Sequence, residues 1–236
     1  MAKYMTEFVG TFFLVLTIGL TVTYDVAMGP LVIGGVLMAL VYMGGHISRA
    51  HYNPAISIVF LIRGAMEFKD LIPYWIAQFT GAIAAAWLLT VITPSELTIE
   101  GQEISRFFGP EPGAGFSLTS PGVWLIEILF TFALALVILN VATSVKTAGN
   151  SYYGLAIGLV VLVGAFAGGH ISGAAFNPAV GIGPNLIKGT MGGSPEAFQN
   201  FGLYTIGPLV GAVVANLVFK IQEDYVVNAT KADAHG

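Results

Sequence analysis

The sequence has no cysteine and very little charge. Without cysteine, the chain can form neither disulfides nor thiolate metal sites. Charged residues make up only 9% of the 236 residues, against roughly 25% in an ordinary soluble domain. The nine Lys and Arg residues form no basic patch, so nucleic-acid binding is not expected. The few His and Asp residues show no triad or metal-ligand spacing, so we expect neither an enzyme nor a bound cofactor.

Apolar residues, in contrast, make up 56% of the chain. A bilayer core of ~30 Å needs about 20 mainly apolar residues in a helix. Two shorter apolar stretches, 53–62 and 177–188, each begin with Asn-Pro-Ala and are too short to span, which favours re-entrant segments. The sequence therefore predicts an all-α membrane protein with six transmembrane helices and two re-entrant half-helices. The predicted spans are 4–24, 30–48, 72–92, 122–143, 152–168 and 202–222.

The basic residues predict the orientation in the membrane. With a cytoplasmic N-terminus, seven Lys and Arg residues fall inside and two outside, as the positive-inside rule expects. The acidic, Pro- and Gly-rich linker 93–121 is then extracellular, and the tail 223–236 is cytoplasmic. The lack of a transit peptide and of long termini favours a prokaryotic inner membrane. The inner residues are Lys3, Arg49, Arg63, Lys69, Lys146, Lys220 and Lys231, and the outer ones are Arg106 and Lys188.

The chain contains an internal repeat. The letters GHIS at Gly45 recur 124 residues later at Gly169, and Asn-Pro-Ala at Asn53 recurs at the same offset at Asn177. Each half, 1–92 and 122–222, contains three spans, an odd number, so the second half must be inverted relative to the first. Inverted repeats place their shared site near the midplane of the bilayer, where broken helices meet. We therefore expect a central path.

The two Asn-Pro-Ala motifs are typical of helix starts. Asn is a strong N-cap, and Pro at the first helical position has a fixed φ and no backbone N–H to leave unpaired. If both half-helices begin at the midplane, their partial positive charges face each other and oppose the passage of cations. The Asn amides can then donate hydrogen bonds to a passing hydroxyl. The candidate site comprises Asn53, Pro54, Ala55, Asn177, Pro178 and Ala179.

The chain resembles the aquaporin (major intrinsic protein) family over about residues 4–222. The resemblance rests on both Asn-Pro-Ala motifs, the GHIS segments, Glu7 and Glu127, and the letters AGNSYYGLAIG before the fifth span. It implies one pore per protomer and a homotetramer in the lipid bilayer. We therefore expect a passive channel for water. The alternative is a secondary transporter, because inverted repeats with broken helices also build transporters.

Two acidic residues and one histidine are further candidates. Glu7 and Glu127 lie in apolar helices, where an ionisable group is costly and usually functional. They form either a proton relay or acceptors for backbone N–H groups of the re-entrant loops, and the resemblance implies the second role. His51 corresponds to a position that lines the cytoplasmic half of the pore in the family. Alternatively, His51 is hydrogen-bonded within its own loop.

The outer filter is where the chain departs from the family. Most members carry Arg directly after the second Asn-Pro-Ala, and this chain carries Val180. An uncharged filter with small side chains predicts passage of glycerol, urea or ammonia beside water, and a lower barrier to protons. The filter is narrower if Phe166 or Phe176 leans into it. The filter residues implied by the resemblance are Ile33, Ala165, Ala174 and Val180.

Arg49 is the second departure. It stands in the letters GHISRAHYNPA, where relatives usually carry Gly and the second repeat has Gly173. One interpretation places its charge at the inner pore mouth, where it partly replaces the missing outer Arg. The other is a side chain that snorkels to the cytoplasm or to lipid phosphate.

Overall fold

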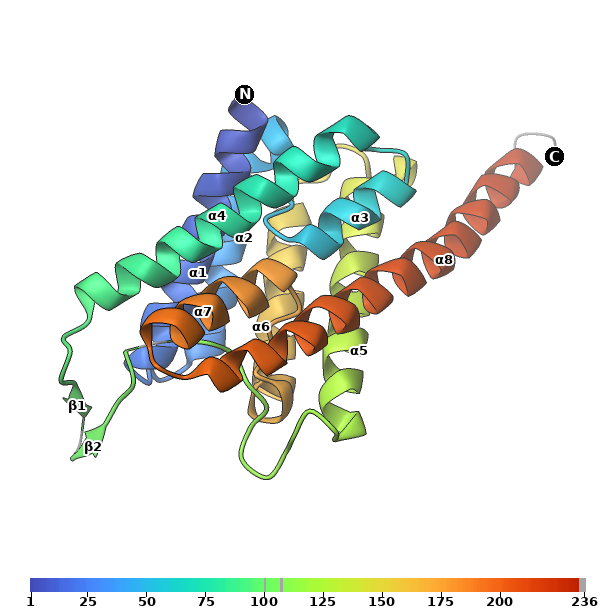
Figure 1. Ribbon diagram of the computed structural model, residues 1–236. Coiled ribbons are helices and arrows are strands. Elements are labelled where there is room, and N and C mark those ends of the chain that lie inside the picture. Colours follow the sequence, from blue (N-terminus) through green and yellow to red (C-terminus); the bar gives the residue numbers. More distant parts are fainter. Residues whose placement is uncertain (100, 107, 234–236) are drawn as a thin grey trace.

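The computed structural model describes residues 1–99, 101–106 and 108–233, and these are almost entirely helical (Figure 1). Within them, six helices are long and apolar enough to cross a membrane, and each overlaps one predicted span. The predicted fold class is confirmed. The spanning helices are α1 (Ala2–Thr23), α2 (Gly29–Ser48), α4 (Phe68–Ile92), α5 (Pro121–Ala142), α6 (Tyr153–Ser172) and α8 (Phe201–Asp233).

Two shorter helices lie among the spanning ones (Figure 1). Helix α3 (Pro54–Ile62) has 9 residues and α7 (Pro178–Met191) has 14. At 1.5 Å per residue, neither reaches across a bilayer core of ~30 Å. Pro at the first position and Asn before it start each helix at the expected residue. Both half-helices are thus held inside the bundle by the longer helices around them.

The two repeats pack in the same way. Helix α1 packs against α4 in the first repeat, and α5 against α8 in the second. A Cβ added at Gly81 would lie 2.6 Å from the Phe8 carbonyl oxygen, and one at Gly211 would lie 2.3 Å from that of Ile128. Glycine at these matched positions therefore lets the paired backbones approach closely, as is common between membrane helices. Between the repeats, α2 packs against α6.

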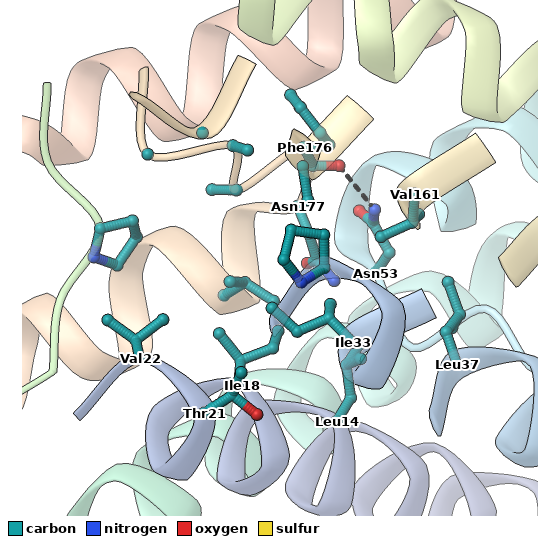
Figure 2. A pocket seen from close by; sticks show the side chains of 18 of the residues that line it. Leu14, Ile18, Thr21, Val22, Ile33, Leu37, Asn53, Val161, Phe176 and Asn177 are labelled. Carbon is teal, nitrogen blue, oxygen red and sulfur yellow. Dashed lines mark hydrogen bonds between the residues drawn. The ribbon is translucent and has the colours of Figure 1, made fainter. Parts of the chain in front are cut away.

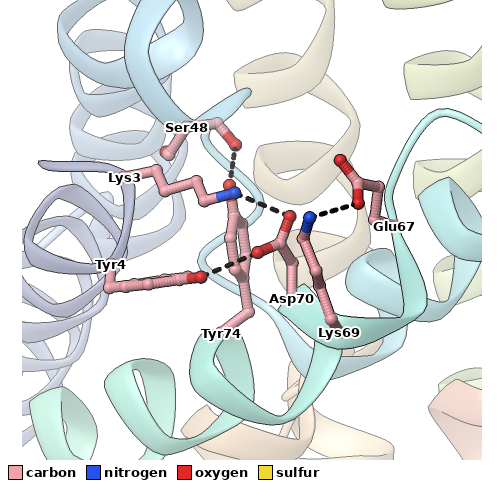
Figure 3. A network of polar contacts seen from close by, with 7 residues as sticks. All are labelled: Lys3, Tyr4, Ser48, Glu67, Lys69, Asp70 and Tyr74. Carbon is pink, nitrogen blue, oxygen red and sulfur yellow. Dashed lines mark hydrogen bonds and ion pairs between the residues drawn. The ribbon is translucent and has the colours of Figure 1, made fainter. Parts of the chain in front are cut away.

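Both ends of the described chain lie at the same end of the bundle, as an even number of spans requires (Figure 1). A polar cluster joins three elements there (Figure 3). The Lys3 ammonium and the Tyr4 hydroxyl donate to Asp70 over 2.6 and 2.7 Å. The Tyr74 hydroxyl donates to the Ser48 carbonyl over 2.9 Å. Helix α4 begins at Phe68, ahead of the predicted start of the span at residue 72, and Asp70 in its first turn takes part in this cluster.

Two segments contain regular structure that the sequence analysis did not predict. Helix α8 continues to Asp233, so the described part of the predicted tail 223–236 is helical rather than a separate segment. Residues 234–236 lie outside the described residues. The linker 93–121 contains a small hairpin, in which β1 (Thr98–Ile99) pairs antiparallel with β2 (Gln102–Glu103). Two short 3₁₀ helices complete the structure: η1 (Val145–Thr147) and η2 (Pro195–Asn200).

Candidate functional site

The two Asn-Pro-Ala motifs meet and are bonded to each other's loops. The side-chain oxygen of Asn53 accepts from the Ala55 backbone N–H over 2.9 Å, and its Nδ2 donates to the Phe176 carbonyl over 2.9 Å (Figure 2). Asn177 accepts from the Ala179 N–H and donates to the Tyr52 carbonyl, both over 2.9 Å. Each cap therefore fixes both its own half-helix and the loop that leads into the other one.

Buried glutamates hold the two loops. Glu7 is fully buried and accepts four hydrogen bonds of 2.6 to 2.9 Å. Glu127, also fully buried, accepts three of 2.8 to 3.0 Å. In each case two donors are backbone N–H groups of the loop and a third is a serine hydroxyl. The donors are Ser48, His51, Tyr52 and Gln78 for Glu7, and Ser172, Ala175 and Phe176 for Glu127.

The loops themselves have an unusual backbone. Three residues in each adopt positive φ, at positions 124 apart, a conformation that L-residues other than glycine seldom take. This left-handed path turns consecutive N–H groups toward the glutamate beneath them. Strained backbone of this kind persists only where surrounding contacts fix it, and it concentrates at functional sites. The matched pairs are Arg49 and Gly173, Ala50 and Ala174, and Tyr52 and Phe176.

A cavity of about 450 Å³ is lined by the asparagines of both motifs. We call it the outer cavity, because the residues of the predicted outer filter also line it. All four predicted filter residues line it, together with Asn53 and Asn177. Much of the remaining wall is apolar, with side chains such as Leu14 and Leu37, which Figure 2 shows around the motif. The predicted filter positions therefore lie together around one space, although their role in selection stays a prediction. They are Ile33, Ala165, Ala174 and Val180.

The aromatic candidates near the filter lie in different places. Phe166 is 46% exposed and is absent from the described lining of the outer cavity. Phe176 does line the cavity, with its ring packed against Phe130 at a centroid distance of 5.4 Å. His51 also lines it, and its ring stacks on Phe60 at 4.2 Å. The His51 Nδ1 lies 3.1 Å from the Ser57 hydroxyl, so this ring both faces the cavity and braces its loop.

The linker 93–121 supplies a wall that the sequence analysis missed. Residues 108–111 line the outer cavity, and the Phe108 ring is buried. The segment is tied to α7, because the Asn185 amide donates to the Pro110 carbonyl over 2.8 Å and Lys188 pairs with Glu111 over 2.9 Å. The Pro- and Gly-rich letters around residue 110 show no periodicity, so sequence alone gave no sign of this contact.

An inner cavity of about 620 Å³ lies on the other side of the asparagines. Arg49 and His46 line it, together with residues of the segment 141–150. The two cavities share four lining residues, and they therefore adjoin at an apolar ring. Three of the four are isoleucines and the fourth is alanine, so the junction carries no polar side chain. The shared residues are Ala50, Ile56, Ile138 and Ile157.

Comparison with known proteins identifies the architecture. The family model for the major intrinsic protein matches residues 1–219, nearly the whole chain. This chain belongs to that family. Aquaporin NIP1-2 of Arabidopsis thaliana is 32% identical over 227 residues, which cover 93% of this chain and 73% of the relative. Nodulin-26 of Glycine max is 32% identical, and the match covers 93% of this chain and 77% of the relative.

A solved structure supports the same fold for this family member. The aquaglyceroporin of Plasmodium falciparum superposes with a TM-score of 0.76, covering 92% of this chain and 94% of that one. At 22% identity, this likeness concerns the fold alone. The sequence-based recognition of the family is confirmed. The named relatives are plant proteins, so they give no support to the predicted prokaryotic inner membrane.

Proposed function

We propose that this major intrinsic protein is a passive membrane channel for water and small neutral solutes. The observation that carries the proposal is the pair of adjoining cavities, of which the outer one is lined by both asparagine caps. Within the described residues, each cap Nδ2 donates one hydrogen bond, which leaves its second hydrogen for a solute. Apolar walls opposite these donors hold a solute without a strong binding site, as rapid conduction requires.

The solute range follows from the outer cavity. Ile33, Ala165, Ala174 and Val180 contribute no charge and no hydrogen-bond donor from their side chains. Without the guanidinium that most members carry here, size and polarity are the remaining criteria at this level. We therefore expect glycerol, urea or ammonia to pass in addition to water.

A secondary transporter is not favoured. Coupled transport needs a group that binds or releases an ion during the cycle, and the buried carboxylates are the available candidates. Glu7 already accepts four hydrogen bonds and Glu127 three, and both oxygens of each carboxylate are engaged. Moving either loop to expose its glutamate would break the caps as well. The relatives named above are aquaporins, which supports the channel.

The membrane arrangement is a multi-pass one, and its finer features belong to the proposal. We place both termini in the cytoplasm on the distribution of Lys and Arg residues. We also propose a homotetramer with one pore per protomer, supported by the family to which the chain belongs. Large apolar side chains such as Leu217 and Trp87 are exposed on α8 and α4, as contact with lipid or a neighbouring protomer requires.

The test is stopped-flow light scattering on liposomes that contain the purified protein. Water efflux is measured with an impermeant osmolyte, and solute entry with glycerol and urea, beside empty vesicles. Two variants separate charge from bulk: Val180→Arg adds a cation to the filter, and Val180→Met adds length alone. We expect rapid water flux with glycerol entry in the parent, and a loss of glycerol entry of at least about tenfold in Val180→Arg.

The outcomes separate the parts of the proposal. Water flux without glycerol or urea entry in the parent would show that another group narrows the filter. Equal losses in Val180→Arg and Val180→Met would assign the effect to size and not to charge. No flux above that of empty vesicles would contradict the channel itself.

A further inference from the structure

The two cavities carry opposite charge. The outer cavity is lined by the carboxylates of Asp25 and Glu111, of which Glu111 is paired with Lys188. Among the described residues, no Asp or Glu lines the inner cavity, and Arg49 is the only Lys or Arg that lines either one. A solute that crosses the path therefore passes one fixed guanidinium, on the inner side.

The Arg49 side chain lines the inner cavity and contacts a core ring, although the residue as a whole is exposed. Its guanidinium carbon lies 5.8 Å from the centroid of the Phe60 ring. Phe60 is a core residue, only 2% exposed, that lines the inner cavity and stacks on His51. A side chain that snorkelled to lipid phosphate would point outward from the bundle. The contact with Phe60 instead holds the charge at the cavity wall, as a cation over an aromatic face.

The backbone at Arg49 has no structural need for arginine. Arg49 ends α2 with φ 68°, and its repeat counterpart Gly173 ends α6 with φ 82°. This left-handed end position is usually filled by glycine, which has no Cβ to strain. Within the described residues, Arg49 forms no ion pair, whereas Lys3, Arg63, Lys69 and Lys188 all do. Arginine at a position suited to glycine, and without a carboxylate partner, indicates a role for the charge itself.

We propose that Arg49 sets the charge selectivity of this pore from its inner mouth. It opposes cations electrostatically before they reach the apolar ring, and neutral solutes pass beside it. The uncharged outer filter then admits larger neutral solutes without giving up the exclusion of cations. This inference rests on the proposed channel function and assigns one residue of that path.

Guanidinium and urea are suitable probes, because they have nearly the same shape and differ in charge. Their entry into liposomes is measured at about 10 mM ionic strength, where screening is weak. Valinomycin and equal K⁺ on both sides hold the membrane potential near zero. Each rate is divided by the water flux of the same preparation. Because every solute passes Arg49 in either direction, mixed orientation of the protein in the vesicles does not matter.

We compare Arg49→Gln, Arg49→Gly and Arg49→Lys with the parent. Lys146→Gln is the matched control, because Lys146 is an exposed cation next to two lining residues and is itself absent from the described lining. Unit charges about 10 Å apart near a protein surface change a crossing rate by about tenfold. We expect guanidinium entry per unit water flux to rise about tenfold in Arg49→Gln and Arg49→Gly. In Arg49→Lys and Lys146→Gln, guanidinium entry per unit water flux should equal that of the parent. Urea entry per unit water flux should be the same in all the variants that change charge.

Three results would overturn the inference. The first is an unchanged guanidinium ratio in Arg49→Gln and Arg49→Gly while water flux persists. The second is an equal rise in Arg49→Lys, which would assign the effect to side-chain shape. The third is the absence of water flux in the parent, which would remove the channel and the inference together. The first two leave the proposed function standing, so the failures are distinguishable.

Discussion

Replacing Glu127 with glutamine tests whether the buried carboxylates brace the loops. One carboxylate oxygen of Glu127 accepts from the Ser172 hydroxyl and the Ala175 N–H, and the other accepts from the Phe176 N–H. A glutamine amide has a single oxygen, so its NH₂ group must face one of these two sides. The serine hydroxyl can rotate to accept, but a backbone N–H cannot. In either orientation, one buried N–H loses its acceptor.

The expected loss of stability follows from this one backbone N–H group without an acceptor. A charge-assisted hydrogen bond contributes about 1.5–3 kcal/mol, and a buried donor left unsatisfied costs about 1–3 kcal/mol. Because the two terms overlap for one N–H group, we expect Glu127→Gln to lower the free energy of unfolding by about 2–4 kcal/mol. Glu7→Gln provides an internal replicate, since its amide must also face either the His51 or the Tyr52 N–H. Glu7→Gln should lower the free energy of unfolding by a similar amount.

The assay is reversible unfolding in mixed micelles, followed by circular dichroism, with water flux measured on the folded fraction. Glu196→Gln is the control, because Glu196 is an exposed carboxylate at the surface of η2 and should change stability by less than about 0.5 kcal/mol. A proton relay makes a different prediction, namely unchanged stability with lost coupling. If Glu127→Gln and Glu7→Gln unfold like the parent, the bracing role is wrong.

Two glycine positions give further predictions. Gly173→Ala should destabilise the protein by about 2–4 kcal/mol in the same unfolding assay. A Cβ at residue 173 would lie 2.8 Å from the Glu111 carbonyl oxygen, and the φ of 82° at residue 173 is unfavourable for alanine. Arg49→Gly at the matched position should instead stabilise by about 0.5–1 kcal/mol, and a loss of stability there would contradict the strain argument. Gly44→Ala should cost about 1–3 kcal/mol, because the new Cβ would lie 1.9 Å from the Tyr52 hydroxyl. Reduced water flux should accompany that loss, since Tyr52 lies in the loop that leads to the first motif, and unaltered flux and stability would show that the ring moves freely.

Much of the fold could be predicted because the bilayer limits the possible structures. Six apolar stretches of about the spanning length predicted transmembrane helices, and the two short ones that begin with Asn-Pro-Ala favoured re-entrant segments. The asparagine and proline of each motif specified where α3 and α7 begin. The repeat offset of 124 residues then paired the motifs, and the structure does bond Asn53 and Asn177 to opposite loops.

The remaining features depend on tertiary contacts that no local pattern encodes. The segment around Pro110 reaches the outer cavity through a side-chain bond from Asn185, a residue 75 positions away. Helix α8 continues past the predicted boundary, and its extension carries the ion pair between Glu223 and Arg63. The apolar ring could not be found either, because Ile138 and Ile157 belong to different spans whose facing surfaces were not known.

The repeats differ where one half carries a polar or charged group that the other lacks. Gln78 donates a fourth hydrogen bond to Glu7, but Pro208, which corresponds to Gln78 when Gly81 is aligned with Gly211, has no donor to offer Glu127. Arg49 and Gly173 differ in the same way. A common backbone explains why both loops need a glutamate, a serine and a tyrosine. The Tyr74 and Tyr204 hydroxyls donate to the carbonyls of Ser48 and Ser172, and each set satisfies the same strained turn. The differences serve no such common need, and both lie in the first repeat: Gln78 is buried beside Glu7, and Arg49 lines the inner cavity. The fixed guanidinium that a solute passes therefore belongs to one repeat only, although the scaffold that holds the asparagines is nearly symmetric.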